Sequence, residues 1–345
     1  MTGYPTDISA PIIHRIEPAR AKPVLVTGAT GLVGNNLVRC LLDQGQAVRV
    51  LVRTGADPRP LEGLDVEQVL GDVRDRAAVS RACDGVQAVL HAAAQIHLGW
   101  TQLEQSREIN VQGTRHLVDA ARHAGARLVQ ISSVDALGAG LPDRPADEEN
   151  FSVEKVPCTY VLTKRESDQV VHQGIREGLD AVIVHPCFML GPWDWKPSSG
   201  RMLLAVAQRF TPVAPAGGCN VCDIRDVAQG ILAAWQSGKT GRGYILGGEN
   251  IRYLELWKLF AKVTGASGPA FRVGPLMRIA AGCWGDLCTR LSGQEPELNS
   301  AAIALSSQYH FYGISRAQKE LGYRCRPIQD SVQDAWNWFQ EYGYA

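Results

Sequence analysis

Short apolar runs alternate with longer amphipathic stretches through the first two thirds of the chain. The runs are rich in valine, isoleucine and leucine. They predict buried strands at residues 24–26, 47–52, 88–90, 128–131, 181–184 and 243–246, with a further strand that ends at Asp72. Between the first two strands, Leu37, Val38, Leu41 and Leu42 have helical spacing, and Gly45 is a stop signal. Alternating strands and helices indicate an α/β fold.

The last third of the chain has a helical pattern, at residues 253–264, 276–291 and 331–342. The stretch 276–291 mixes large apolar side chains such as Trp284 and Leu287 with charged ones such as Asp286. We expect an amphipathic helix that packs its apolar side on the protein's own core. The alternative is a patch that lies on a membrane surface. The stretch 138–156 is polar and rich in prolines and acids, and it predicts a surface loop.

A glycine turn, Thr27-Gly28-Ala29-Thr30-Gly31-Leu32-Val33-Gly34, follows the first strand directly and leads into the first helix. Gly28 permits a tight turn, Gly31 lets backbone approach a pyrophosphate, and Gly34 lets helix and strand pack closely. The free N–H groups at the helix start favour phosphate. This order predicts a Rossmann-type doubly wound parallel sheet. The candidate cofactor contacts in the turn are Gly28, Thr30, Gly31, Leu32 and Val33.

Three later strand ends carry further candidate cofactor residues. Arg53 stands where an NAD enzyme usually has an acid that binds the ribose hydroxyl, and a guanidinium suits a 2′-phosphate instead. We therefore expect NADP, with NAD as the alternative. Asp72, followed by Val73, is expected to cap a helix and to reach the adenine, and the small residues 92–94 (Ala92, Ala93 and Ala94) would let backbone lie close to a ligand.

The strongest chemical signal is Tyr160 and Lys164, four apart on a predicted helix, downstream of Ser132-Ser133 at a strand end. A phenol of ordinary pKa about 10 needs help to exchange protons near neutrality. We expect the Lys164 ammonium to lower the pKa of Tyr160, and a serine hydroxyl to hold the substrate oxygen.

Composition narrows the classes of function. The 345 residues carry 35 basic and 35 acidic side chains, so nothing indicates nucleic acid as a partner. No run reaches the roughly eighteen uninterrupted apolar residues of a membrane span, and residues 1–21 lack the features of a signal peptide. Nine scattered cysteines favour a reducing cytoplasm. Cys219 and Cys222 lack the second pair that zinc would require, so no metal is expected.

Taken together, these motifs resemble the extended short-chain dehydrogenase/reductase family, also called the NAD-dependent epimerase/dehydratase family, over roughly residues 22–342. The motifs are Thr-Gly-Ala-Thr-Gly-Leu-Val-Gly, Gly-Asp-Val-Arg-Asp, His-Ala-Ala, Ile-Ser-Ser and Tyr-Val-Leu-Thr-Lys. The chain looks most like the dihydroflavonol-reductase and 3β-hydroxysteroid-dehydrogenase branch, and closer still to hopanoid-associated sugar epimerases. That last likeness rests on Trp193-x-x-Lys196-Pro197, Gly200-Arg201 and the segment 244–250.

The resemblance implies a role for each catalytic candidate. Tyr160 would be the acid/base, Lys164 would bind the nicotinamide ribose, and Ser133 would polarise the substrate oxygen. Ser133 is favoured over Ser132 because it lies five residues before Gly138, the family's usual spacing. Pro186 and Phe188 would lie against the nicotinamide.

The resemblance also implies how the chain is divided. We expect a leader at residues 1–21 and a nucleotide-binding domain at 22–186, rejoined by about 224–247. A smaller, mostly helical substrate domain would take residues 187–223 and 248–345. A cytoplasmic enzyme for a small-molecule substrate follows, and a homodimer is compatible with it.

For the substrate site we expect Ile96, His97, Asp135, Trp193 and Arg201. The wall is otherwise apolar and aromatic, with Leu98, Trp100, Met189 and Trp195, which suits a lipophilic ketone or alcohol. Dehydratase relatives carry Asp-Glu directly after the catalytic threonine, whereas this chain has Val134-Asp135 at the corresponding positions. Sugar epimerases place an arginine where Cys219 stands. A nucleotide-sugar epimerase or dehydratase remains the first alternative, and a dinucleotide-binding sensor without catalysis is the second.

Overall fold

The computed structural model describes residues 22–345, so the expected leader at residues 1–21 lies outside the described part of the chain. Its centre is a sheet of seven strands in the order β10-β6-β5-β4-β1-β2-β3, and every neighbouring pair is parallel. The strands are β1 (Val24–Thr27), β2 (Val48–Val52), β3 (Glu67–Leu70), β4 (Ala88–His91), β5 (Arg127–Ile131), β6 (Ala181–Pro186) and β10 (Gly243–Leu246). The predicted doubly wound parallel sheet is confirmed.

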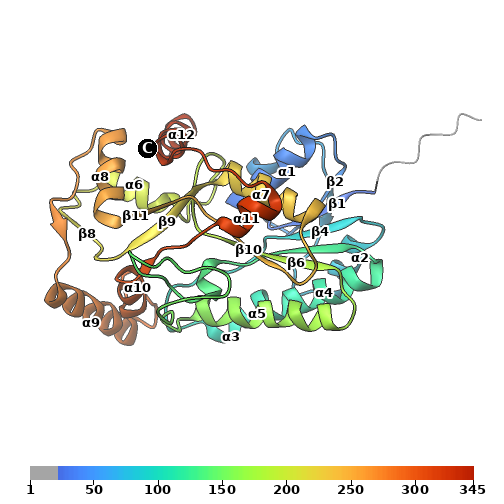
Figure 1. The fold of residues 1–345 in the computed structure, drawn as a ribbon, viewed down its shortest axis with the longest axis horizontal. Helices are drawn as coiled ribbons and strands as arrows, with labels where there is room; N and C mark the ends of the chain where they lie inside the picture. Colours follow the sequence, from blue (N-terminus) through green and yellow to red (C-terminus); the bar gives the residue numbers. More distant parts are fainter. Residues whose placement is uncertain (1–21) are drawn as a thin grey trace, which may run out of the picture.

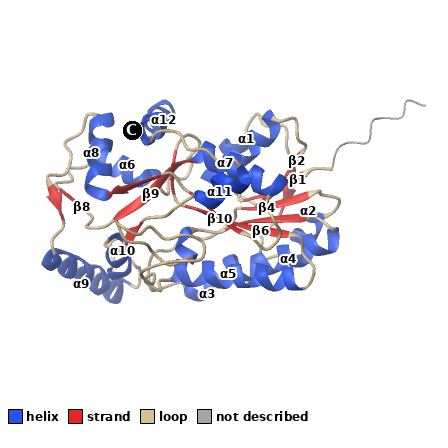
Figure 2. Cartoon of the chain, in the orientation of Figure 1, coloured by secondary structure: helices blue, strands red, loops and turns tan. Residues whose placement is uncertain are grey.

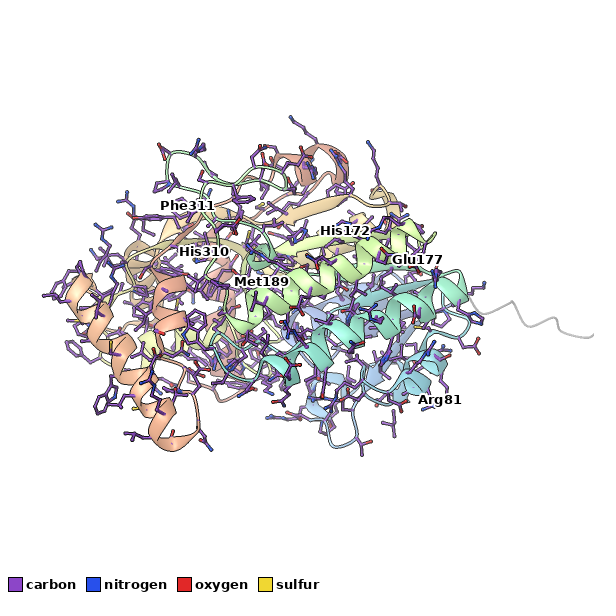
Figure 3. All side chains as sticks on the ribbon, turned by 90° about the horizontal axis from the view of Figure 1, so that it is seen from below. Arg81, His172, Glu177, Met189, His310 and Phe311 are labelled. Atoms are coloured by element: carbon purple, nitrogen blue, oxygen red, sulfur yellow. The ribbon has the colours of Figure 1, made fainter. Side chains whose placement is uncertain are left out.

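Helices cover both faces of this sheet (Figures 1 and 2). One face is covered by α1 (Leu32–Asp43), α7 (Ile224–Ser237) and α11 (Ser315–Leu321), and the other by α2 (Arg76–Cys83), α4 (Gly113–Ala124) and α5 (Thr159–Arg176). Successive strand residues point to opposite faces, so Val24 and Val26 pack with the α1 side while Leu25 packs with the α2 side. Figure 3 shows α4 and α5 side by side beneath the sheet, with Glu177 at the end of α5.

Three short helical pieces connect these elements. The helix α3 (Leu103–Arg107) runs through a π-helical turn (Glu108–Gln112) into α4. Two 3-10 turns, η1 (Arg59–Leu61) and η3 (Val134–Ala136), follow β2 and β5.

The C-terminal region is mostly helical, as expected. It contains α6 (Gly200–Gln208), α8 (Tyr253–Thr264), α9 (Pro275–Ser292), α10 (Ser300–Ser306) and α12 (Ile328–Glu341). It also contains a second sheet that the sequence pattern did not predict. This sheet is built from β7 (Phe188–Leu190), β9 (Gly218–Asp223), β11 (Glu249–Arg252) and β13 (Tyr309–His310), and a separate pair joins β8 (Val213–Ala214) to β12 (Phe271–Arg272). Between these segments, α7 and β10 return to the main sheet, where β10 pairs with β6.

The stretch 138–156 contains no regular helix or strand, but it is not simply a surface loop. Ala139 and Ala146 are buried, and so is Lys155. The Tyr312 hydroxyl donates to the carbonyl oxygen of Gly138 at 2.9 Å, which ties the start of the stretch to the segment after β13. The surface-loop prediction was wrong at these positions because the C-terminal region folds over them.

The helix α9 also departs from expectation. Its buried residues are Gly282 and Gly285, whereas Leu276 is 83% exposed, Leu291 79% and Trp284 67%. The prediction that α9 packs its apolar side on the protein's own core was therefore wrong. No helix within residues 22–345 has the length and apolar character needed to cross a membrane.

Candidate functional site

The glycine turn joins β1 to α1 with almost no spare room. Gly28 has a φ of +69°, and a Cβ there would lie 2.8 Å from the carbonyl carbon of Ala92. A Cβ on Gly34 would lie 2.2 Å from the carbonyl oxygen of Gly28, so helix and turn touch through backbone. Each glycine is thus required by a close approach.

Gly31 is different, because a Cβ there would meet nothing nearer than the carbonyl oxygen of Gly28 at 3.4 Å. Gly31 is the N-cap of α1, and no side chain caps the helix. The first N–H groups of α1, which belong to Leu32 and Val33, therefore have no partner within the helix. An uncapped helix start above an open glycine fits the pyrophosphate of a dinucleotide.

The residues expected to bind the rest of a dinucleotide lie along the same sheet edge. Arg53 is exposed just after β2, and its side chain makes no hydrogen bond or ion pair within residues 22–345. The Ala93 amide donates to the Thr27 hydroxyl at 3.2 Å, which fixes the backbone of residues 92–94 against the turn. This donor set fits a nicotinamide dinucleotide.

Asp72 does not cap a helix, contrary to expectation. Its carboxylate accepts from the Arg74 backbone N–H at 2.9 Å and from the Arg74 Nε at 3.0 Å, and the hydrogen bonds to Arg74 lower the pKa of the Asp72 carboxyl. Asp75 is the N-cap of α2 and accepts from the amides of Ala77 and Ala78. The pattern Gly-Asp-Val-Arg-Asp offers two aspartates, and the chain places the second at the helix start. Val73 is buried against Gly113.

The structure brings Ser133, Tyr160 and Lys164 together at the carboxyl end of β5. Ser133 caps η3 and accepts from the Asp135 amide at 3.1 Å. Tyr160 and Lys164, 8% and 4% exposed, share one face of α5. Lys164 Nζ donates to the carbonyl oxygen of Ile131 at 3.0 Å and lies 5.9 Å from the centroid of the Tyr160 ring. The Ser132 hydroxyl turns away and donates to Asp168 Oδ2 at 2.7 Å.

Burial governs the electrostatics of this cluster. Desolvation, followed by the charge of Asp135, raises the pKa of Tyr160 above its ordinary value, although the hydrogen bond with Ser133 lowers it. Burial also lowers the pKa of Lys164 to about 8, opposed by Asp168 and Asp135, and raises the pKa of Asp168 to about 7. The expectation that Lys164 lowers the pKa of Tyr160 does not hold for the protein by itself, so Tyr160 carries its proton at neutral pH.

A second buried polar cluster adjoins the first and was missed by the sequence analysis. Lys155, whose side chain is fully buried, contacts Asp135 Oδ1 at 2.7 Å and also hydrogen-bonds His310 Nδ1. Asp135 Oδ2 accepts from the Ser133 hydroxyl at 3.3 Å. Burial opposes the charge of Asp135, but Lys155 and His310 outweigh it and hold its carboxyl pKa below the ordinary value. A lysine is rarely buried, and His310 is distant in sequence, so no local signal reveals this cluster.

Asn110 is another residue that the pattern did not single out. It lies in the π-helical turn between α3 and α4, and its Nδ2 donates to the Gln95 carbonyl oxygen at 2.9 Å and to the Thr163 hydroxyl at 3.0 Å. Asn110 thereby ties the segment after β4 to α5, at the residue directly before Lys164. A π-helical turn at a functional site is a common structural device, but it has no sequence signature.

The residues expected at the substrate wall separate into two places. Ile96, Leu98 and Trp100 are exposed, and the loop that carries them is held by hydrogen bonds to the start of α5, from the Tyr160 amide to the His97 carbonyl oxygen at 3.2 Å and from the Thr159 amide to the Gly99 carbonyl oxygen at 2.9 Å. His97 Nε2 contacts Glu295 Oε2 at 2.9 Å. These residues border Tyr160 directly.

Trp193 lies elsewhere. The Arg39 guanidinium of α1 stacks 3.4 Å from the centroid of its ring, and the ring packs with Trp195, Trp338 and Tyr342 in an aromatic cluster of the C-terminal region. This packing gives Trp193 and Trp195 a core position, so we do not carry them into the substrate site. Arg201, exposed in α6, pairs with Glu297. Pro186 ends β6, and Phe188 begins β7 in the second sheet.

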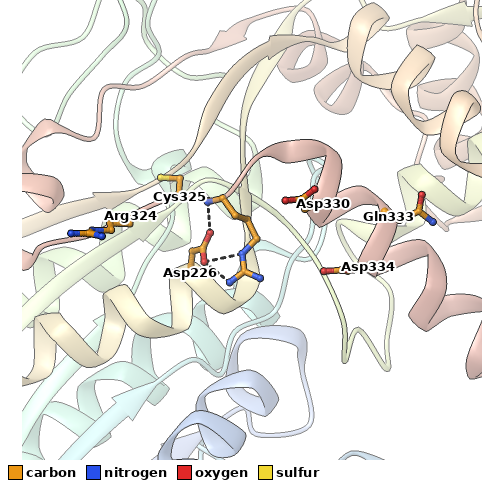
Figure 4. Close-up of a pocket in the computed structure, with 7 residues that line it drawn as sticks. Asp226, Arg324, Cys325, Asp330, Gln333 and Asp334 are labelled. Carbon is orange, nitrogen blue, oxygen red and sulfur yellow. Dashed lines mark hydrogen bonds and ion pairs between the residues drawn. The ribbon is translucent and has the colours of Figure 1, made fainter.

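A cavity of about 520 Å³ lies between α7 and α12, away from Tyr160 (Figure 4). Three of its charged groups have partners, since Arg326 Nε donates to Asp226 Oδ1 at 3.0 Å and Asp334 pairs with Arg225, whereas the side chains of Arg324 and Asp330 have none among residues 22–345. We interpret it as a structural ion-pair region. Cys219 and Cys222 are both buried, and the described residues contain no cluster of three or more His, Cys, Asp or Glu side chains that could hold a metal.

Comparisons with known proteins agree with this geometry. Residues 24–247 match the NAD dependent epimerase/dehydratase family. The chain is 37% identical to a putative dihydroflavonol 4-reductase of Synechocystis sp., over 94% of this chain and 97% of that protein. It is 34% identical to sterol demethylase protein B of Methylococcus capsulatus, over 92% and 98%. The crystal structure of gox2253 superposes with a TM-score of 0.82 at 35% identity, covering 93% of this chain and 99% of that one.

Proposed function

The chain belongs to the NAD-dependent epimerase/dehydratase family and is an NAD(P)-dependent oxidoreductase of the extended short-chain dehydrogenase/reductase type, and from this we propose that it transfers a hydride to or from a lipophilic ketone or secondary alcohol. The observation that carries the proposal is the position of Tyr160. Its phenol lies beside Ser133 and Lys164, and its backbone N–H donates to the loop that carries the exposed apolar side chains of Ile96, Leu98 and Trp100. The names of the relatives, one a sterol demethylase protein, support a lipophilic substrate.

Hydride transfer is the chemistry that a bound nicotinamide supplies, and this chain's residues supply the rest. In reduction, the Tyr160 hydroxyl donates its proton to the substrate oxygen as the carbonyl carbon gains the hydride, and the reverse transfer makes Tyr160 the base in oxidation. Burial raises the pKa of Tyr160 in the protein by itself, so this exchange requires a nearby positive charge, such as the Lys164 ammonium, that brings the pKa of the phenol back toward neutrality.

Ser133 and Lys164 position the reacting groups. The Ser133 hydroxyl donates to Asp135 Oδ2 across 3.3 Å, a weak contact, so it turns readily to donate to a substrate oxygen and stabilise its developing charge. Lys164 is fixed by the carbonyl oxygen of Ile131 at the carboxyl end of β5, which leaves its remaining N–H donors for the ribose hydroxyls of the cofactor.

For the cofactor we propose a preference for NADP over NAD. The exposed, unpaired guanidinium of Arg53 stands after β2, where a 2′-phosphate would lie, and Asp72 is already engaged by Arg74. The residues proposed to contact the dinucleotide are Gly28, Thr30, Gly31, Leu32, Val33, Arg53, Asp72, Val73, Ala92, Ala93, Ala94, Tyr160, Lys164, Pro186 and Phe188.

Activity assays with a panel of ketones and alcohols graded by apolar size, beside binding assays with UDP- and GDP-sugars, test the substrate class. We expect turnover that rises with apolar size and no micromolar binding of a nucleotide sugar. Micromolar binding of a nucleotide sugar that is lost in Arg201→Ala would contradict the proposal and identify an epimerase, because Arg201 is an exposed cation whose ion-pair partner, Glu297, is also exposed, so a diphosphate could replace that partner.

A further inference from the structure

The outer face of α9 is apolar along its whole length. Residues spaced three or four apart share a face of a helix, and Leu276, Ala280, Cys283, Leu287 and Leu291 have this spacing, with Met277 and Trp284 beside them. We call these seven residues the α9 face. Each of the seven is exposed.

The inner side of α9 explains why the helix cannot turn this face inward. A Cβ on Gly285 would lie 2.0 Å from the carbonyl oxygen of Leu298, and a Cβ on Gly282 would lie 3.3 Å from the Cα of Ser300. The helix therefore packs on the segment around α10 through its small residues. Rotating it would bring large side chains into backbone, so its apolar face is fixed outward.

The segment on which the inner side of α9 packs extends toward the proposed catalytic residues. The indole N–H of Trp100 donates to the Ser300 hydroxyl at 2.8 Å, and Asn299 Nδ2 donates to the Leu98 carbonyl oxygen at 3.1 Å. The exposed apolar loop 96–100 is thus tied to the turn that joins α9 to α10.

The helix α10 connects α9 with the catalytic tyrosine. Ala301 and Leu305 of α10 pack in one cluster with Tyr160 and Val161. Loop 96–100 and α10 therefore lie between the inner side of α9 and Tyr160. Figure 1 shows α9 and α10 at one end of the molecule, with α3 and the start of α5 beside them.

The charges around this face are mostly positive. Arg290 is exposed beside this face, and Arg272 in β12 is exposed just before the helix, whereas Arg278 has the spacing of the inner side of α9. The single acid between Phe271 and Ser292, Asp286, accepts from the Ser300 amide at 3.1 Å. An apolar helical face bordered by arginines is the pattern of helices that lie in the headgroup region of anionic bilayers.

From these observations we propose that the α9 face docks on the surface of an anionic lipid bilayer and that a lipophilic substrate passes from the bilayer across loop 96–100 to Tyr160. The second half rests on the proposed function; the first half does not. A second copy of the chain suits the face less well. A two-fold contact would set the same patch against itself and bring the arginines of both copies together.

Vesicle co-sedimentation of the full chain tests docking without any substrate. We use vesicles of phosphatidylglycerol and phosphatidylethanolamine, beside vesicles of phosphatidylcholine alone. The chain should bind the anionic vesicles, and Leu276→Asp should weaken this binding by about tenfold or more. The matched control, Leu70→Asp, changes a leucine that is 61% exposed on the edge strand β3, and it should bind as the unaltered chain does.

The contribution of charge is tested separately with Arg290→Gln. This substitution should weaken binding to anionic vesicles by about fivefold and leave binding to phosphatidylcholine vesicles unchanged. Three results would overturn docking: no binding to either kind of vesicle, equal losses of binding in Leu276→Asp and Leu70→Asp, or a stable dimer that only Leu276→Asp dissociates.

Delivery is tested by activity on a lipophilic ketone held in the vesicles beside a short water-soluble ketone. Leu276→Asp should slow only the first. If Leu276→Asp and the unaltered chain reduced the vesicle-held ketone at equal rates, delivery would be refuted. If the unaltered chain turned over neither ketone, the proposed function would be refuted, while the vesicle-binding result would stand.

Discussion

The helices α1 and α9 are both amphipathic, but the protein uses them in opposite ways. Leu37, Val38 and Leu41 of α1 are fully buried against the main sheet, and the N-cap glycine of that helix, Gly31, lies where we propose that the cofactor phosphates bind. In α9 the large apolar side chains face outward and glycines face the protein. An amphipathic pattern thus predicts a helix and a stripe, but it does not determine what covers the stripe. In α1 the covering surface is the protein's own sheet, and in α9 no part of residues 22–345 covers the stripe.

The largest effect should come from replacing Tyr160, the proposed acid/base. Tyr160→Phe removes only the hydroxyl, so turnover should fall about 10²- to 10⁴-fold while cofactor affinity is unchanged. Steady-state kinetics and cofactor titration measure the two. Tyr309→Phe, which removes a phenol hydroxyl from a ring packed on Phe311, is the control and should keep its rate. If Tyr160→Phe retained most of the turnover, the proton would move through another group.

Matched leucine substitutions test the comparison of the two helices directly. Leu37→Ala should lower the free energy of unfolding by about 2–5 kcal/mol, because it leaves a cavity beneath α1. Leu276→Ala should change that energy by less than about 0.5 kcal/mol, because the side chain is mostly in water. Urea denaturation monitored by circular dichroism measures both. A comparable loss in Leu276→Ala would mean that something covers α9 in the free protein.

The proposed preference for NADPH over NADH is tested by Arg53→Ala. A charge-assisted contact to a 2′-phosphate contributes roughly 1.5–3 kcal/mol, so the variant should lose about tenfold to hundredfold in NADPH affinity. NADH affinity should stay the same, and it serves as the internal control. Fluorescence titration of both reduced cofactors measures the ratio. Tighter binding of NADH by the unaltered chain would show that Arg53 is only a solvated side chain.

The smallest effect concerns the buried histidines. Burial lowers the pKa of His91 to about 3 and the pKa values of His185 and His310 to about 4, from an ordinary value of 6.5. Between pH 6.5 and 4 the unfolded chain therefore binds more protons than the folded one, and the free energy of unfolding falls as the pH drops.

Replacing one of these histidines should reduce, by at most one proton, the difference in bound protons between the unfolded and the folded chain, and so should reduce the slope of the unfolding free energy against pH. His310→Gln should flatten it by at most about 1.4 kcal/mol per pH unit, whereas His123→Gln, at an exposed position, should leave it unchanged. Denaturation series at several pH values measure the slope. An unchanged slope in His310→Gln would mean that His310 takes up protons as readily in the folded chain as in the unfolded one.

The sequence by itself determined the local parts of this protein. The strand, glycine turn and helix at residues 24–43 were predictable because the backbone contacts that require glycine there are local. They lie only a few residues away or at the end of the neighbouring strand. Tyr160 and Lys164 could be paired from their spacing, because four residues of helix place both on one face. The parallel direction of the strands in the main sheet followed from the alternation of strands and helices, whereas the order of the strands did not.

Only the tertiary structure decided the contacts between distant segments. Lys155 meets Asp135 and His310 because the second sheet brings β13 over the stretch after β5, and no local pattern records that approach. Trp193 packs on Arg39 of α1 rather than lining a substrate wall. The pKa of Tyr160 follows from burial, which its neighbours in sequence do not set. The outward face of α9 depends on which side of the helix meets the backbone around Ser300, and periodicity alone cannot distinguish a face turned to the core from one turned to a bilayer.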